Sequence, residues 1–163
     1  MRQLVLLVVT LGLLSGCTGE IWYVDSRFSP DEEQMILAAH EDWVAIGAPP
    51  QNFVFGQHTD VRDTGRKVIV KAGWRAAASV FDGFRPEDKA ASCLNRDDLN
   101  AAYQIVMVTE YNPPAVFQRN FAHELGHHYL GSEHSAREDA LMFTTALVPG
   151  PTEEEARRLR GAL

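Results

Sequence analysis

Two histidines four residues apart constrain the folding of this chain more than any other feature. They occur in the stretch His123-Glu124-Leu125-Gly126-His127. Successive residues of an α-helix turn by about 100°, so residues four apart project within about 40° of each other. On a helix, His123 and His127 can therefore bind one metal ion from adjacent turns. The spacing predicts a helix with a metal site on one face.

Glu124 would lie about 100° from His123 on such a helix, too far round to be the natural third ligand. It is better placed to reach a water molecule in an open metal position and to act as a general base. The third ligand must come from beyond the helix. Gly131 can adopt the left-handed conformation that ends a helix, and His134 follows it. These residues predict a zinc hydrolase with His123, His127 and His134 as ligands.

The pattern resembles the signature of the metzincin zinc endopeptidases, H-E-x-x-H-x-x-G-x-x-H followed by a methionine turn. One residue is inserted here, because Gly131 comes four residues after His127 and His134 comes seven after it. Two ligand sets are open. The favoured set keeps His123 and His127, and a longer or looser last helical turn carries the extra residue before Gly131.

His128 is the alternative second ligand, because it has the family spacing to Gly131 and His134. It would lie about 140° from His123 unless a π-bulge rewound the helix. On a regular helix His128 instead falls on an apolar face. That face carries Phe117, Phe121 and Leu125. The regular helix therefore predicts that His128 is a packed or hydrogen-bonded core histidine.

The segment Asp139-Ala140-Leu141-Met142-Phe143 resembles the methionine turn, most closely that of the matrixin branch. In that family the methionine lies beneath the metal without ligating it, and the resemblance gives this role to Met142. It implies an α+β, metzincin-like zincin domain: a twisted mixed sheet, an active-site helix, the methionine turn and a C-terminal helix. It also implies an endopeptidase that hydrolyses peptide bonds with a zinc-activated water and Glu124 as general base. The alternative is a catalytically inactive, zinc-stabilised binding lipoprotein of the cell envelope.

The N-terminal residues have the pattern of a bacterial lipoprotein signal. An apolar run from Leu4 to Leu14 is too short to span a membrane, and Cys17 follows a lipobox-like pair of small residues. We expect residues 1–16 to be a signal peptide, Cys17 to carry lipid, and residues 17–163 to form one catalytic domain. The expected location is the bacterial cell envelope. Thr18 rather than aspartate after the cysteine favours the periplasmic face of the outer membrane in a host with two membranes.

Charge and cysteine content restrict the partners further. The formal net charge is −7, and Lys and Arg form no cluster of the kind that a nucleic-acid surface requires. We therefore expect protein or peptide substrates and no nucleic acid. Only two cysteines are present. Lipidation of Cys17 would leave Cys93 alone, so no intramolecular disulfide is expected in the mature chain.

Local patterns predict the order of the elements. Strand formers occur at residues 21–24, and a capping box with proline starts a helix at Ser29 that ends near Ala45. Further strands are expected near residues 53–55, 67–71 and 105–109. Helices are expected at residues 115–130 and from Thr152 onward. The pattern between residues 74 and 100 is weak, with a loop at residues 82–88, and no edge strand is identified.

Other polar residues have simpler interpretations. His40 lies on the apolar face of the first helix and is expected in the core. His58 and Asp60 could bind a second ion, but a surface turn is favoured. A glutamate among residues 153–155 could replace His134 as third ligand. Acidic first turns, however, ordinarily complement the helix dipole.

Overall fold

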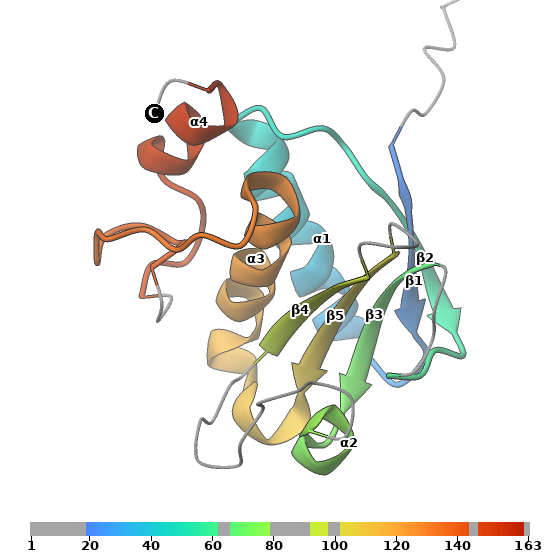
Figure 1. The fold of residues 1–163 in the computed structure, drawn as a ribbon. Coiled ribbons are helices and arrows are strands. Elements are labelled where there is room, and N and C mark those ends of the chain that lie inside the picture. Colours follow the sequence, from blue (N-terminus) through green and yellow to red (C-terminus); the bar gives the residue numbers. More distant parts are fainter. Residues whose placement is uncertain (1–18, 62–65, 79–91, 98–101, 144–146, 162–163) are drawn as a thin grey trace, which may run out of the picture.

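The computed structural model describes residues 19–61, 66–78, 92–97, 102–143 and 147–161, and for residues 92–97, 102 and 103 it describes the backbone only. The expected signal peptide, Cys17 and the expected loop at residues 82–88 therefore lie outside the described residues. The elements, drawn in Figure 1, are β1 (Ile21–Asp25), α1 (Pro30–Ala45), β2 (Asn52–Gln57), β3 (Lys67–Ala72), α2 (Trp74–Ala78), β4 (Ser92–Asp97), β5 (Ala102–Val108), the 3-10 turn η2 (Thr109–Tyr111), α3 (Pro114–Leu130) and α4 (Glu153–Leu159).

The five strands form one mixed sheet in the order β2-β1-β3-β5-β4. Strands β2, β1, β3 and β5 are parallel to one another, and β4 pairs antiparallel with β5 at one edge of the sheet. Parallel neighbours need a crossover connection, which α1 supplies between β1 and β2. The mixed sheet and its helices agree with the expected α+β class.

Apolar side chains cover both faces of the sheet. On one face α1 and α3 lie across the strands (Figure 1) and enclose the larger core. That core includes Trp22, Val24, Ile69, Ile105 and Met107 from the strands. The opposite face carries Val68, Val70, Val106 and Val108, which pack with Ala77 of α2. This burial of both faces is typical of parallel strands and explains their nearly continuous apolar runs.

Helix α1 begins and ends where the sequence predicts. The N–H of Glu32 donates to Ser29 Oγ at 3.3 Å, and the N–H of Ser29 donates to Glu32 Oε2 at 2.7 Å. This reciprocal capping box satisfies two backbone donors at the helix start. Gly47, at φ +108°, follows the helix end. His40 is buried and accepts a hydrogen bond from Gln51 N at 2.9 Å, which confirms its predicted place in the core.

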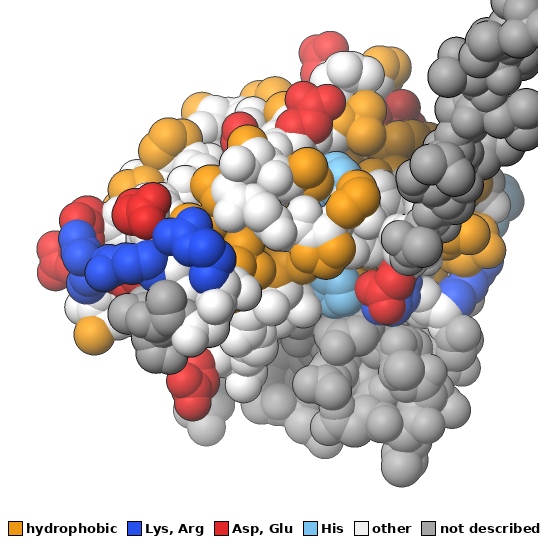
Figure 2. Space-filling model, turned by 90° about the horizontal axis from the view of Figure 1, so that it is seen from above, with side chains coloured by type: hydrophobic (Ala, Val, Ile, Leu, Met, Phe, Trp, Pro, Cys, Tyr) orange, Lys and Arg blue, Asp and Glu red, His pale blue; other side chains and the backbone are white. Residues whose placement is uncertain are grey.

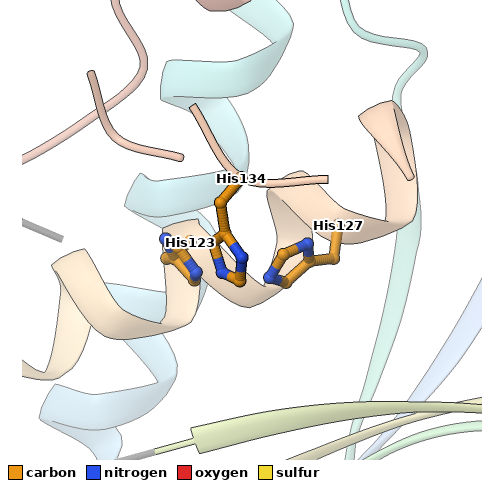
Figure 3. A group of neighbouring side chains, drawn as sticks. All are labelled: His123, His127 and His134. Carbon is orange, nitrogen blue, oxygen red and sulfur yellow. The ribbon is translucent and has the colours of Figure 1, made fainter. Parts of the chain in front are cut away.

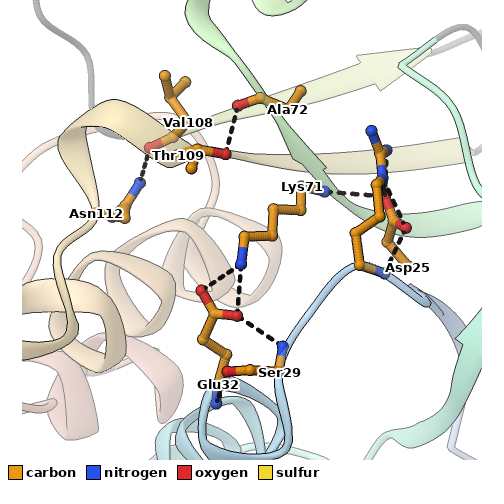
Figure 4. Close-up of polar contacts among 9 residues, drawn as sticks. Asp25, Ser29, Glu32, Lys71, Ala72, Val108, Thr109 and Asn112 are labelled. Carbon is orange, nitrogen blue, oxygen red and sulfur yellow. Dashed lines mark hydrogen bonds and ion pairs between the residues drawn. The ribbon is translucent and has the colours of Figure 1, made fainter.

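An ion pair between Glu32 and Lys71 connects the first turn of α1 to strand β3 (Figure 4). Lys71 Nζ on β3 lies 2.8 and 2.6 Å from the two carboxylate oxygens of Glu32. Asp25, at the end of β1, accepts hydrogen bonds from Arg27 and from the Lys71 N–H. Burial raises the pKa of Asp25, but these hydrogen bonds outweigh burial and hold the pKa below its usual value. The ends of β1 and β3 are therefore fixed relative to α1.

The structure adds two elements that the sequence pattern does not reveal. Strand β4 is the edge strand, and its residues Ser92–Asp97 lack an alternating apolar pattern. The short helix α2 follows β3 directly. Strand β5 also begins three residues before the predicted start at residue 105. Pairing between β4 and β5, which is a tertiary interaction, defines these two strand segments more than local propensity does.

Gly126 lies where α1, α3 and the segment around Met142 come closest together. A Cβ atom at this position would lie 2.3 Å from Met142 Sδ and 2.6 Å from Trp43 Cζ2. Trp43 is fully buried, and its Nε1–H donates to the carbonyl of Ala122 at 2.8 Å. The indole ring therefore cannot move aside without losing a buried hydrogen bond. Only glycine allows this approach.

We predict that Gly126→Ala lowers the free energy of unfolding by about 1–3 kcal/mol, because an added methyl overpacks this contact. Urea unfolding monitored by circular dichroism measures the change. In an uncrowded helix the same substitution would stabilise by about 1 kcal/mol. An unchanged or increased stability would therefore contradict the close packing at Gly126.

Candidate metal centre

The structure brings three of the sequence-predicted ligands together. His123 and His127 come from successive turns of α3, and His134 comes from the segment after the helix (Figure 3). One potential ligand atom of each lies within 4.8 Å of the others. The ring centroids are 4.8, 4.9 and 5.3 Å apart. This cluster could hold one metal ion.

Backbone carbonyls set the tautomers of two of these histidines. His123 Nδ1 lies 2.8 Å from the carbonyl oxygen of Leu141, and His127 Nδ1 lies 3.0 Å from that of Gly131. A carbonyl oxygen only accepts hydrogen bonds, so each Nδ1 carries the hydrogen. The lone pair is therefore on Nε2 in both rings. A hydrogen bond of this kind, on the ring nitrogen that does not face the metal, is typical of metal-binding histidines.

Burial keeps the two helical histidines of the cluster neutral. It lowers the pKa of His123 to about 4, although the hydrogen bond to Leu141 acts in the opposite direction. Burial also lowers the pKa of His127 below its ordinary value. Metal ions bind the neutral imidazole, so both rings are in the binding form at neutral pH.

The inserted residue is accommodated at the end of α3. The helix continues as α-helix to Leu130, and Gly131 caps it at φ +87° with its N–H donating to the His127 carbonyl at 3.0 Å. A residue with a side chain would be strained at this φ. The chain then turns back to His134. The extra residue thus lengthens the helix before the glycine, and its cap supplies the carbonyl that orients His127.

His128 points away from the cluster. Its Nε2 lies 3.1 Å from Glu20 Oε2, and its ring packs edge-on against Trp22 at 5.2 Å. Only a tenth of its side chain is exposed. The described helix contains no π-bulge that would redirect it. This packing agrees with the expected role of His128 as a packed histidine of α3.

The segment after His134 is bound to the segment around Met142. The Ser135 N–H donates to the Met142 carbonyl at 2.7 Å, and Ser135 pairs with Phe143 as an isolated parallel bridge. Met142 is fully buried, with its sulfur against Gly126, between the two ligand positions on α3. Met142 therefore supports both the helix and the segment that carries the third histidine.

Helix α4 holds the same two segments through consecutive glutamates. Ser135 Oγ donates to Glu154 Oε1 at 2.5 Å. Glu155 is fully buried and accepts the N–H of Met142 at 3.0 Å and the N–H of Thr152 at 2.8 Å. Burial raises the pKa of Glu155, but these hydrogen bonds outweigh it and keep the pKa below its usual value.

The role of Glu155 was not apparent from the sequence. The sequence predicts residues 153–155 as complements of the helix dipole, with a glutamate as third metal ligand as the alternative. Among the described residues, the group that could hold an ion contains His134 and none of these glutamates. The available signal was the capping box of Thr152 and Glu155, which predicts a buried or bonded glutamate at the third helical position.

The remaining sequence candidates are not part of the group of three histidines. Glu124 is the nearest of them in sequence, buried on α3 next to His123. His58 and Asp60 are exposed, and no group of three ligands within the described ranges includes them. Cys93 lies on β4, where side chains are not described. Figure 2 shows histidine side chains reaching the surface between hydrophobic ones, and His134 is exposed.

Comparison with known proteins assigns no family to this chain. No family model matches the sequence, and no curated protein matches it. The likeness to metzincins therefore rests on the motif residues between His123 and Met142.

We predict that His127→Gln abolishes the binding of one zinc ion per chain, whereas His128→Gln leaves it intact. His127 Nε2 points at the cluster, while His128 contacts Glu20 and Trp22. Mass spectrometry of the metal in the purified full chain measures the content. Loss of zinc in His128→Gln with retention in His127→Gln would contradict the ligand set.

We predict that the metal-free protein loses stability as the pH falls from about 6.5 to 4. In this window the unfolded histidines bind protons that the buried rings do not, so protonation favours unfolding. For His123, whose pKa falls from 6.5 to about 4, the loss is on the order of 3 kcal/mol. Urea unfolding in a chelating buffer at several pH values measures it.

Two results would contradict this account of the buried histidines. One is a free energy of unfolding that stays constant or increases as the pH falls through this window. The other is an unchanged slope in His123→Gln, a substitution that removes a buried histidine whose pKa is lowered to about 4.

Proposed function

We propose that this protein is a zinc-dependent endopeptidase of the cell envelope. The observation that supports it best is the convergence of three histidines, with both helical rings oriented by carbonyls and a buried glutamate following the first. A purely structural site has no use for that glutamate. The resemblance of the motif to metzincins adds peptide bonds as the class of substrate.

The donor set fits zinc. Three imidazole nitrogens with a fourth position left open are a common ligand set of catalytic zinc sites. Neutral rings with hydrogen on Nδ1 leave the lone pair of Nε2 free to bind the metal. His123, His127 and His134 would hold the ion. When bound, zinc supplies Lewis-acid chemistry, because it polarises a carbonyl group and makes water more acidic.

Glu124 performs the proton transfers in this mechanism. It follows His123 on α3, in a buried position where a carboxylate is poorly solvated. As general base it takes a proton from the attacking water, and as general acid it delivers that proton to the leaving amine. His123 and His127 keep their ring orientation throughout, because Leu141 and Gly131 hold their Nδ1 atoms.

Strand β4 offers a place to align an extended peptide. It is an edge strand, and α3 packs next to it. In Figure 3 the rings of His123 and His127 project from α3 on the side of this strand, and the ring of His134 reaches the same place from the segment after the helix. An extended peptide can add to a sheet edge through main-chain hydrogen bonds, which give affinity without requiring a particular sequence. A substrate bound in this way would pass near the histidine cluster.

The proposed location rests on the sequence of the N-terminus. Residues 1–16 would be removed as a signal peptide, and lipid on Cys17 would anchor the domain to the membrane. No helix in the described residues is long and apolar enough to cross a membrane. Strand β1 begins at Ile21, so only three residues would separate the lipid on Cys17 from this strand.

We predict that Glu124→Gln reduces peptide hydrolysis by about 10²–10⁴-fold, because the proton acceptor is lost while the shape of the side chain is kept. Cleavage of a quenched fluorescent peptide library by the zinc-loaded full chain measures this change. Zinc content and thermal stability should match those of the unsubstituted chain.

The matched control is Glu133→Gln, which removes an equal charge from the exposed residue before His134. It should leave hydrolysis unchanged. If the unsubstituted zinc protein cleaves no peptide, or Glu124→Gln cleaves as fast, the enzyme proposal fails. A zinc-stabilised binding protein would then be the better description.

A further inference from the structure

One peptide group connects the buried carboxylate of α4 to a histidine of the metal centre. The N–H of this group belongs to Met142 and donates to Glu155 Oε1 at 3.0 Å. Its carbonyl oxygen belongs to Leu141 and lies 2.8 Å from His123 Nδ1. Glu155, Met142 and Leu141 are fully buried, and His123 is 7% exposed. The chain of contacts is therefore shielded from water over its whole length.

Hydrogen bonds in series strengthen one another in such surroundings. A carboxylate that accepts an N–H forms a charge-assisted bond and draws the peptide dipole into line. The carbonyl oxygen at the other end becomes a stronger acceptor for the ring N–H of His123. A stronger bond at Nδ1 makes Nε2 a better metal ligand, as it does where a carboxylate contacts a ligating histidine directly.

We propose that Glu155 is a positioning residue of the metal centre, which acts on His123 through the peptide group between Leu141 and Met142. The inference rests on the proposed function only in requiring that His123 bind a metal ion. Glu155 fixes the ring with hydrogen on Nδ1 and increases the donor strength of Nε2. It also places the peptide itself, because the backbone N–H of Thr152 holds the other carboxylate oxygen, Oε2, at 2.8 Å.

His127 provides an internal comparison. Its Nδ1 contacts the Gly131 carbonyl at 3.0 Å. The N–H of that peptide group belongs to Ser132, which is exposed. Among the described residues, no carboxylate accepts a hydrogen bond from it. The two helical ligands thus differ in their support, and a carboxylate strengthens only the contact of His123.

The test measures the zinc affinity of the full chain in detergent by competition with a chromophoric chelator. We expect Glu155→Gln to weaken zinc binding about 10–100-fold, the usual effect of removing a group that supports a metal ligand through hydrogen bonds. Glu153→Gln is the charge-matched control, because Glu153 lies on the same helical turn but is exposed and pairs with Arg160. It should bind zinc as tightly as the unsubstituted chain.

Thr152→Ala is the stability-matched control. It removes the N-cap of α4 and the hydroxyl contact to Glu155, but it leaves the backbone N–H of Thr152 on Glu155 Oε2 and the bond between Glu155 and Met142. It should lower the thermal stability of the metal-free protein and leave zinc affinity nearly unchanged. If Thr152→Ala weakens zinc binding as much as Glu155→Gln does, Glu155 acts only through stability and the proposal is overturned.

The outcomes separate this inference from the proposed function. If the unsubstituted chain binds no zinc, both fail. If it binds zinc and Glu155→Gln binds equally tightly, only the role of Glu155 fails.

A second measurement needs no variant and decides the matter if Glu155→Gln does not fold. In nuclear magnetic resonance spectra of the zinc-loaded chain, the ring Nδ1–H of His123 should resonate further downfield than that of His127. The reverse order would overturn the proposal, since it would show the stronger hydrogen bond at the ring that lacks a carboxylate behind it.

Discussion

The packing of Met142 against Gly126 is the contact on which the candidate metal centre depends. It brings α1, α3 and the segment after His134 together, because Trp43 closes the same space from α1. The backbone of Met142 makes two further contacts. The Met142 carbonyl accepts a hydrogen bond from Ser135, next to His134, and the Met142 N–H donates to Glu155. A side chain at position 126 would disturb all of these contacts together.

The three candidate ligands are held by different parts of the fold. His123 and His127 are fixed by α3 and by the carbonyl groups of Leu141 and Gly131. The segment that carries His134 is held by hydrogen bonds from Ser135 to Met142 and to Glu154 of α4. The extra residue relative to the metzincin pattern is absorbed by one more residue of α3 before Gly131. Gly131 turns the chain at a positive φ, and His134 then lies beside His123 and His127. The same insertion leaves His128 facing Trp22.

Local sequence signals predicted much of this fold. The capping box at Ser29 marked the start of α1 correctly, and the histidine spacing predicted a helix that the structure contains. Strand β4 was missed because its residues carry no alternating apolar pattern, and pairing with β5 defines it. The contact of Glu155 with Met142 was missed for a related reason. A capping box is visible in four residues, but a partner thirteen residues away is fixed only by tertiary packing.

X-ray absorption spectroscopy of the zinc-loaded full chain tests the central claim most directly, because it reports the atoms bound to the metal. The account predicts one zinc ion with three imidazole nitrogens at about 2.0–2.1 Å and one oxygen at a similar distance. A sulfur ligand at about 2.3 Å, or fewer than three imidazoles, would contradict it. Either of those spectra would mean that His123, His127 and His134 do not form the metal centre described for this chain.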